Sequence, residues 1–570
     1  MRQTSKSRLE EIARWLQKCP DVAENRLPDD LLRDLSDDSK YQLKARLTFN
    51  PTGTNLLGLS FPRFGEDASC RLQRRFGSSR LLYVDYVEPS SDDCTSLHTT
   101  RSEFRQTFLP RWLTAAHDFL GCQWRCFHIE EKDSSSKDSG RQQNGSYRLR
   151  FFAISGIGIK AIHLRSFFDA FLPLNLNLEQ PFVKAYARIP LSLSQTKPTI
   201  TFDHSQIRRV RDILADGSPE ATCFDDPNLA FPRYHNASNP RVMSDGCARM
   251  SPAAFRAVCK SLGIQGDQPV ALQCRLGGAK GMWMLSSSPG SEKDDGEIWI
   301  EVSDSQLKYE TGSGDMELEV IKHPTALKPS SLFMDFLPIL QDRGVPSEVL
   351  MAVAEQQIVN DFEAVFAAID DRTLLLRWLG RTFGADLSRN RDSGIKHHGR
   401  TPRDPLERVI GLLENGFMPK DCPVMAEYFQ DIVKAWALET TQKLKPRLPK
   451  STYAYGVPDL DGVLAPGEIY VATSVPYEDD EAGEFRVCLQ GDVLVARHPT
   501  LRNSDMQKVR AVYKPELSHY KDVVIFSTRG ELPLAGKLQG GDYDGDQFWN
   551  NVGQTSGEAF PKRARSSNLT

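Results

Sequence analysis

The hydrophobic pattern begins with strands and then changes to helices. Residues 147–154 alternate in polarity and are rich in aromatic side chains, which predicts a strand within a mixed α and β N-terminal third. From Val345 onwards apolar residues recur every three or four positions, behind Pro346 and Ser347 as helix-start residues. This spacing predicts one long amphipathic helix. Its apolar positions are Leu350, Ala354, Ile358, Phe362, Val365, Phe366 and Ile369.

Helical spacing continues through residues 406–413 and 426–433, so roughly residues 330 to 445 are expected to form a helical block. After Pro449 the pattern changes to short strands punctuated by Gly, Pro and Asp. The predicted strands are residues 468–472, 492–497 and 522–527. Short strands that return through Gly-rich loops favour a small closed barrel over an open parallel sheet.

Composition narrows the class of protein without revealing its chemistry. A chain of 570 residues is longer than one hydrophobic core usually organises, and polar segments at 132–146 and 286–296 predict surface insertions.

The net charge of −4 means that binding to a polyanion requires a local positive surface. No apolar stretch approaches the ~18 residues of a membrane helix, so no membrane anchorage is expected. The 11 cysteines lack CxxC spacing, which indicates reduced thiols in the cytosol or nucleus.

The segment with the clearest chemistry is residues 540–546, which reads Gly-Gly-Asp-Tyr-Asp-Gly-Asp. Three carboxylates that converge in a small volume repel one another, and a divalent cation is the usual counter-charge. Hard oxygen ligands of this kind suit Mg²⁺ or Mn²⁺. A calcium-binding EF-hand is excluded, because that loop needs Gly and Glu where this chain has Gln547 and Gly553. The remaining alternative from the residues alone is a solvated acidic turn.

This segment resembles the active-site motif of the eukaryotic cell-encoded RNA-dependent RNA polymerases of RNA silencing, and the fungal branch fits best. Residues 273–281 and 305–309 are similar to two basic motifs of that family. Asp245-Gly246 also matches a family block, but a tight turn explains an Asp-Gly pair equally well, so it is left out of the predicted site. The likeness reaches from Tyr41 to Asp546. Flanking blocks at 467–471, 491–499 and 524–530 resemble the family's in the same order.

The resemblance implies an α+β fold with two double-psi β-barrels joined by a helical neck, behind a mixed α/β N-terminal region. The head domain that family members carry after the aspartate motif is expected to be absent, which implies a C-terminally truncated chain. The implied boundaries are an N-terminal region at 1–180, a first barrel at 181–330, a neck at 331–448, a second barrel at 449–555 and a disordered tail at 556–570.

The resemblance also implies roles for particular residues. The three aspartates would hold Mg²⁺ or Mn²⁺, and cations from the opposite barrel would face them. One family position departs: Ser303-Asp304 stands where an Arg-Pro pair is usual, which makes that edge less basic. The implied metal ligands are Asp542, Asp544 and Asp546; Lys280 and Lys308 join them as catalytic residues; and Arg275, Lys280, Lys308 and Arg497 would bind substrate or RNA.

The implied function is synthesis of complementary, double-stranded RNA for RNA silencing. Single-stranded RNA and ribonucleoside triphosphates would be the partners, single-stranded DNA is a second candidate template, and homodimers are frequent in the fungal branch. The nucleus or the cytoplasm is the expected compartment. Two alternatives stay open: an inactive RNA-binding remnant of the family, and a magnesium-dependent phosphohydrolase. The second is disfavoured, because its Asp-x-Asp would be followed by Thr or Val at the end of a parallel strand.

Overall fold

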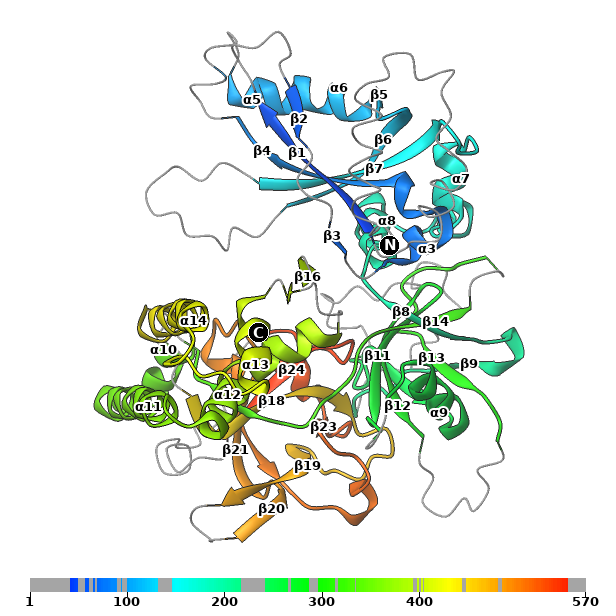
Figure 1. Cartoon of the computed structure of the whole chain (residues 1–570). Helices are drawn as coiled ribbons and strands as arrows, with labels where there is room; N and C mark the ends of the chain where they lie inside the picture. Colours follow the sequence, from blue (N-terminus) through cyan, green and yellow to red (C-terminus); the bar gives the residue numbers. More distant parts are fainter. Residues whose placement is uncertain are drawn as a thin grey trace. The chain divides into compact units, whose positions relative to one another are not determined.

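The computed structural model divides into two compact units (Figure 1). Unit 1 comprises residues 1–197 and 309–315, and unit 2 comprises residues 198–308 and 316–570. The residues that the structure describes are 41–49, 57–60, 65–66, 69–89, 94, 100–131, 146–216, 241–264, 268–286, 296–312, 316–333, 335–392, 397–398, 401–402, 404–442, 447–479 and 484–551. The predicted tail at 556–570 and most of both predicted insertions lie outside these ranges.

Unit 1 is built on one mixed sheet whose main path runs β2-β1-β4-β7-β6-β5. The bounds of these strands are β1 Tyr41–Phe49, β2 Leu57–Ser60, β4 Leu81–Val87, β5 Ala116–Phe119, β6 Cys122–Glu131 and β7 Ser146–Gly156. The central strand β7 confirms the strand predicted at 147–154. Its residues alternate between two cores: Leu149 and Phe151 join one cluster, whereas Phe152 joins a second cluster with Phe167. This period of two is what a sheet covered on both faces requires.

The helical block of unit 2 confirms the predicted helices. Their bounds are α10 Phe336–Asp342, α11 Ser347–Ala368, α12 Arg372–Asp392, α13 Pro405–Glu414 and α14 Pro423–Gln442. Their shared core holds Trp378, Leu379 and Met425 among others. The predicted apolar face of α11 is only partly right, because Val365 is buried whereas Phe366 is 71% exposed. Figure 1 shows these helices grouped beside the strands that follow them in the chain.

The second strand-rich region of unit 2 closes into a six-stranded ring. Its strands pair in the order β18-β23-β19-β22-β21-β24, and β24 pairs again with β18. The bounds are β18 Arg447–Pro458, β19 Glu468–Asp479, β21 Gly491–Ala496, β22 Met506–Ala511, β23 Val523–Phe526 and β24 Gln547–Asn551. Pairs β18–β23 and β19–β22 are parallel, and the other pairs of the ring are antiparallel. The strands and the closed barrel predicted from the sequence are therefore present.

The first strand-rich region of unit 2 is a seven-stranded path, β8-β14-β11-β12-β10-β13-β9. The bounds are β8 Lys197–Thr201, β9 Ile207–Val210, β10 Cys247–Met250, β11 Ala271–Leu276, β12 Ala279–Leu285, β13 Ile300–Ser303 and β14 Glu317–Lys322. Helix α9 (Pro252–Ser261) begins at Ser251, whose hydroxyl accepts a hydrogen bond from the Ala254 amide. Its Phe255 and Val258 pack on one face of this sheet, together with Leu272.

The other face of this sheet packs against the second barrel. Met282 and Met284 of β12 belong to the core of that barrel, whereas Trp283 between them belongs to the core under α9. Because side chains alternate along a strand, Lys280 shares the face of Met282. Gln273 lies directly opposite Met282 in the antiparallel pair β11–β12, so it shares this face too. The alternation therefore directs two polar side chains of the first barrel toward the second.

Candidate active site

The aspartate loop, residues 540–546, connects a short helix, α15 (Leu534–Lys537), to β24. At its end the Asp546 carbonyl accepts a hydrogen bond from the Gly456 amide of β18 at 3.0 Å. In its middle Tyr543 is 1% exposed and packs in the core of the second barrel. With Tyr543 buried in that core, the loop is held while the aspartates on either side remain only partly buried.

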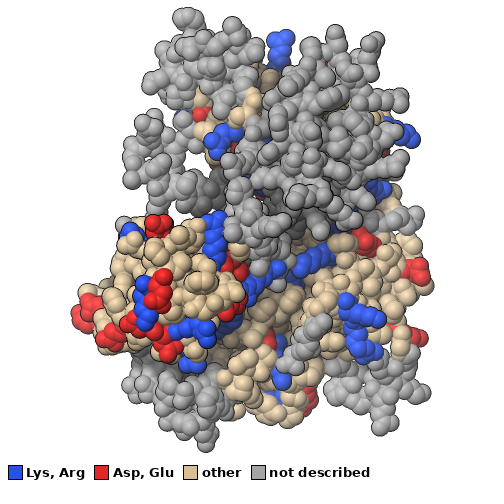
Figure 2. Space-filling model, in the orientation of Figure 1, with Lys and Arg blue, Asp and Glu red and all other residues tan. Residues whose placement is uncertain are grey.

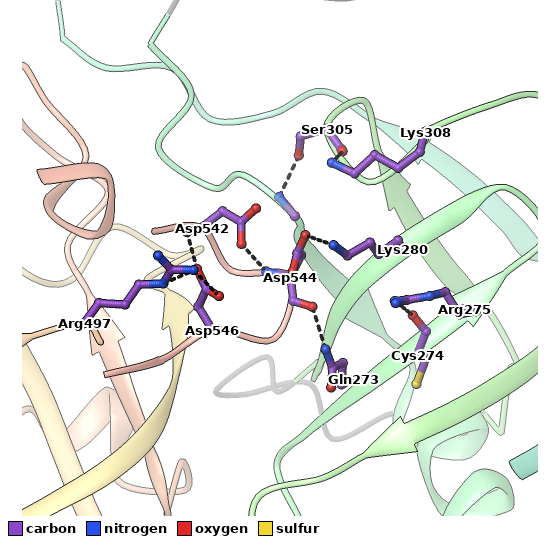
Figure 3. Close-up of polar contacts among 11 residues, drawn as sticks. Gln273, Cys274, Arg275, Lys280, Ser305, Lys308, Arg497, Asp542, Asp544 and Asp546 are labelled. Atoms are coloured by element: carbon purple, nitrogen blue, oxygen red, sulfur yellow. Dashed lines mark hydrogen bonds and ion pairs between the residues drawn. The ribbon is translucent and has the colours of Figure 1, made fainter. Parts of the chain in front are cut away.

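The three aspartate side chains converge (Figure 3). One carboxylate oxygen from each of Asp542, Asp544 and Asp546 lies within 4.8 Å of the others. Hydrogen bonds inside the loop fix this arrangement: the Asp544 amide donates to Asp542 Oδ1 at 3.2 Å, and the Asp542 amide donates to Asp546 Oδ2 at 3.0 Å. Three hard oxygen ligands at this separation fit one divalent cation of the Mg²⁺ or Mn²⁺ class.

Cations approach this cluster from both barrels. Lys280 Nζ of β12 lies 2.5 Å from Asp544 Oδ2. Arg497, which follows β21, places Nε 2.8 Å from Asp546 Oδ2 and Nη2 3.0 Å from Asp546 Oδ1. Both pairs are partly buried, so solvent screens them less than it screens fully exposed ion pairs. Two of the three carboxylates therefore have a cationic partner.

Asp542 has the least favourable electrostatic environment of the three. Burial, together with the neighbouring carboxylates of Asp544, Asp546 and Asp245, raises the pKa of Asp542 to about 8. The cluster therefore resists carrying its full negative charge when only protein groups surround it. A bound divalent cation removes this penalty, which is a second reason why the residues fit a metal site.

The first barrel also contacts the backbone of the aspartate loop. Gln273 Nε2 donates to the Asp544 carbonyl at 3.0 Å, and the Tyr543 amide donates to the Asp245 carbonyl at 2.8 Å. Gly246 has φ +85°, and a Cβ there would lie 2.9 Å from the Asp544 Cβ and 3.0 Å from its amide nitrogen. Only glycine allows this close approach between the two barrels.

Ser305 supports Gly246 from behind. Its hydroxyl accepts a hydrogen bond from the Gly246 amide at 2.8 Å and donates to Asp212 Oδ1 at 2.7 Å. Burial raises the pKa of Asp212 to about 6, against the hydrogen bonds from Ser305, which lower it. Lys308 Nζ donates to the Ser305 carbonyl at 2.6 Å. A chain of hydrogen bonds thus connects the second basic motif to the turn that touches the aspartate loop.

Comparisons with known proteins agree with this two-sided site. The family model described as RNA dependent RNA polymerase matches residues 59–564. The chain belongs to this family. The structure of RNA dependent RNA polymerase QDE-1 from Thielavia terrestris is 30% identical in sequence and similar with a TM-score of 0.77. That similarity covers 98% of this chain and 59% of the other.

Curated relatives come from a fungus and from plants. RNA-dependent RNA polymerase 1 of Schizosaccharomyces pombe is 25% identical over 324 residues, which is 54% of this chain and 24% of the relative. RNA-dependent RNA polymerase 1 of Arabidopsis thaliana is 23% identical over 393 residues, which is 69% of this chain and 30% of the relative. The chain thus spans about a quarter to a third of the length of these polymerases. The family and the fold class, with two double-psi β-barrels and a helical neck, are confirmed.

The structure brings together five of the residues predicted for the polymerase site. The five are Asp542, Asp544, Asp546, Lys280 and Arg497. Lys308 reaches the site through Ser305 and Gly246. Arg275 is buried, its Nη1 donates to the Cys274 carbonyl at 3.2 Å, and it lies in register between Lys280 and Glu319. The contacts described for Arg275 lie within its own sheet.

The sequence-based site missed three contacts that hold the loop. Asp245-Gly246 was attributed to a turn, and Gln273 and Ser305 lie inside the two basic motifs without being assigned a role. The signal for Asp245-Gly246 was its match to a family block. The signal for Gln273 and Ser305 was their spacing of two and three residues from Arg275 and Lys308. Only the folded structure shows that these polar side chains support the aspartate loop.

Proposed function

We propose that this chain catalyses template-directed nucleotidyl transfer on single-stranded RNA, producing complementary RNA and hence a double strand. The observation that carries the proposal is the meeting of two barrels at one site: the aspartates of the second barrel lie within 4.8 Å of one another, and Lys280 of the first lies 2.5 Å from Asp544. Membership of the RNA dependent RNA polymerase family supports the same reaction.

In this proposal Asp542, Asp544 and Asp546 would hold Mg²⁺ or Mn²⁺. When bound, the cation would lower the pKa of the attacking 3′-hydroxyl and neutralise charge on the triphosphate. The aspartates therefore act as ligands and not as general bases. Gln273 and Gly246 keep the loop at a fixed distance from the first barrel, so the ligand geometry does not depend on one barrel alone.

The reaction forms a bond between the 3′-oxygen and the α-phosphorus and breaks the bond to the leaving pyrophosphate. Lys280 lies at the edge of the carboxylate cluster, and its ammonium can donate charge-assisted hydrogen bonds to phosphate oxygens as their charge increases. Lys308 and Arg275, from the same barrel, are proposed to contact the triphosphate or the RNA backbone.

An RNA template needs a positive surface despite the chain's net charge of −4. Figure 2 shows Lys and Arg side chains forming a band across the middle of the visible face of unit 2, between the neck helices and the first barrel. A band of one sign concentrates a polyanion locally even when the whole protein is slightly acidic. This distribution supports a path for a nucleic-acid strand beside the barrels.

The family also suggests a metal, a biological process, a second template, an assembly and a compartment for this chain. We propose Mg²⁺ or Mn²⁺ as the metal, RNA silencing as the process, single-stranded DNA as a second template, a homodimer as the assembly, and the nucleus or cytoplasm as the compartment. The nine described cysteines are all free thiols, which supports a reducing compartment. Among the described residues no helix is long and apolar enough to cross a membrane.

The test is nucleotide incorporation by the purified chain on a single-stranded RNA template with labelled nucleotides and Mg²⁺ or Mn²⁺. Asp544→Asn keeps the shape of the side chain but removes a ligand charge. Asp492→Asn removes one carboxylate from the exposed start of β21 and serves as the matched control. We expect Asp544→Asn to lose at least about 100-fold in rate, as removal of a major transition-state interaction does, and the control to match the wild type.

Equal incorporation by the wild type and Asp544→Asn would overturn the proposal. Binding of RNA without incorporation by the wild type would favour the alternative predicted from the sequence, an RNA-binding remnant of the family. A salt titration of that binding would then count the phosphates contacted, because the logarithm of affinity falls linearly with the logarithm of salt concentration.

A further inference from the structure

Arg497 contacts both ends of the aspartate loop. Its Nη1 donates to the carbonyl of Gln539, just before the loop, at 3.2 Å. Its Nε and Nη2 form a two-pronged contact with Asp546, at the end of the loop, at 2.8 and 3.0 Å. The aliphatic part of the Arg497 side chain packs against Gly541, because a Cβ added at Gly541 would lie 3.0 Å from Arg497 Cδ. One side chain therefore ties the beginning of the loop to its end, and Figure 3 shows its contact with Asp546.

These contacts fix the direction in which Asp546 can bind a cation. A carboxylate offers about four lone-pair sites. Nη2 of Arg497 donates to one on Oδ1, the Asp542 amide donates to one on Oδ2, and Nε of Arg497 lies beside Oδ2 at 2.8 Å as an ion pair. Oδ1 is therefore the less crowded oxygen, with a lone pair open to a cation. A planar guanidinium fork imposes this geometry, whereas a flexible ammonium group would not.

The backbone that carries Arg497 is itself held in place. The preceding residue, Ala496, is fully buried and lies in register with Trp549 of β24, the strand that follows the loop. The Thr500 hydroxyl donates to the Arg497 carbonyl at 2.8 Å. The Asp335 carboxylate accepts from the Thr500 amide at 3.1 Å and contacts His498 Nδ1 at 2.8 Å. The side chain therefore starts from an anchored turn.

We propose that Arg497 is a positioning residue that orients Asp546 toward the catalytic cation, and that it does not act as the RNA contact expected from the sequence. This inference rests on the proposed polymerase function. Lys280 differs, because the ion pair described for it joins Asp544 to a flexible ammonium group, which can turn toward a substrate phosphate. The two cations beside the cluster thus have separate tasks: Arg497 shapes the ligand set, and Lys280 meets the substrate.

The decisive variant is Arg497→Lys, which keeps the charge and removes the fork. The matched control is Arg510→Lys, an exposed arginine of β22 in the same barrel. Mn²⁺ affinity is measured by titration calorimetry on the full chain without RNA or nucleotide. Loss of a group that orients a metal ligand typically costs about 10- to 100-fold in metal affinity. We expect a loss in this range for Arg497→Lys and wild-type affinity for Arg510→Lys.

A second measurement separates positioning from RNA contact. RNA affinity is measured against salt for Arg497→Gln, since loss of one phosphate contact reduces the salt slope by about 1. We expect an unchanged slope. A weaker variant, Thr500→Val, removes the hydroxyl that holds the Arg497 carbonyl and should lower Mn²⁺ affinity in the same direction with less risk to folding. Wild-type Mn²⁺ affinity in Arg497→Lys, or a reduced slope in Arg497→Gln, would overturn the inference.

The inference can fail independently of the proposed function. If the wild type incorporates nucleotides and Arg497→Lys binds Mn²⁺ normally, the polymerase proposal stands and the positioning role is wrong. If the wild type binds Mn²⁺ and RNA but incorporates nothing, the polymerase proposal is wrong, and the calorimetric comparison still decides the role of Arg497. In both cases the thermal unfolding midpoints of the variants show whether each one is folded.

Discussion

Gly246 approaches the aspartate loop so closely that adding a single methyl group, as in Gly246→Ala, is expected to disturb catalysis. In Gly246→Ala the new Cβ would lie 2.9 Å from the Asp544 Cβ, about 0.5 Å short of the 3.4 Å at which ordinary van der Waals contact begins. The neighbouring atoms on the Asp544 side include backbone, so a flexible side chain cannot simply swing away. The loop must move by about half an ångström, away from its hydrogen bond to the Asp245 carbonyl.

The size of the effect follows from that displacement. A misplacement of about 1 Å can cost about 100-fold in rate, so half of it should cost about 10-fold or more. Alanine at a positive φ also destabilises the fold, by about 1 to 2 kcal/mol. Gly467→Ala is the matched control, because Gly467 has φ +80° against +85° for Gly246 and no atom within 4 Å of its Cβ position.

Two assays separate the backbone strain of an alanine at positive φ from the displacement of the aspartate loop. Chemical denaturation should show similar losses in the free energy of unfolding for both glycine variants. Nucleotide incorporation and Mn²⁺ titration should show a loss of about 10-fold or more for Gly246→Ala alone. Equal incorporation rates in the two variants would refute the reasoning, since the backbone cost would then account for the whole effect and the contact between the barrels would have no catalytic consequence.

Three further predictions concern single side chains. Because the pKa of Asp542 is raised from 3.8 to about 8, its ionisation opposes folding without metal. The unfolding midpoint should fall as the pH rises from about 4 to about 8 and level off above that, with a smaller fall in Asp542→Asn or with Mn²⁺; an identical pH profile in Asp542→Asn would contradict this. Lys280→Met should lose about 100-fold in incorporation, because it removes the ammonium proposed to meet the substrate phosphate. Its Mn²⁺ affinity should be kept or raised, because that ammonium lies 2.5 Å from Asp544 and competes with the cation; equal losses in both would argue for a structural role. The buried Tyr543 hydroxyl has no hydrogen-bond partner among the described residues, so Tyr543→Phe should leave the free energy of unfolding unchanged or raise it by about 1 kcal/mol. The control is Tyr520→Phe, which removes a 3.1 Å hydrogen bond to the Leu285 carbonyl and should lower the free energy of unfolding by about 1 kcal/mol.

Helices, strands and the aspartate loop could be predicted from the sequence because each depends on residues that are close together in the chain. The helical spacing after Val345 predicted α11, and the strands of the second barrel followed from runs of apolar residues between Gly, Pro and Asp. The aspartate loop was recognisable because its carboxylates and glycines lie within seven consecutive residues. The exposed Phe366 shows the limit of periodicity, since spacing predicts a face but not what covers it.

The supports of the loop were harder to predict because they come from distant parts of the chain. Asp245-Gly246 lies about 300 residues before the aspartates, and its sequence is equally typical of an ordinary turn. Its importance comes from the packing of one barrel on the other, which places its backbone against Asp544. The family resemblance assigned Arg497 to substrate or RNA, whereas its two-pronged contact with Asp546 depends on the pairing of β21 with β24.

The two barrels are proposed to form one template-directed active site. The most direct measurement is the choice of nucleotide by the wild-type chain on homopolymer templates with Mn²⁺. We expect poly(U) to direct incorporation of labelled ATP and poly(A) to direct incorporation of labelled UTP, and both reactions to be lost in Asp544→Asn. Incorporation that ignores the template, or that survives in Asp544→Asn, would contradict it.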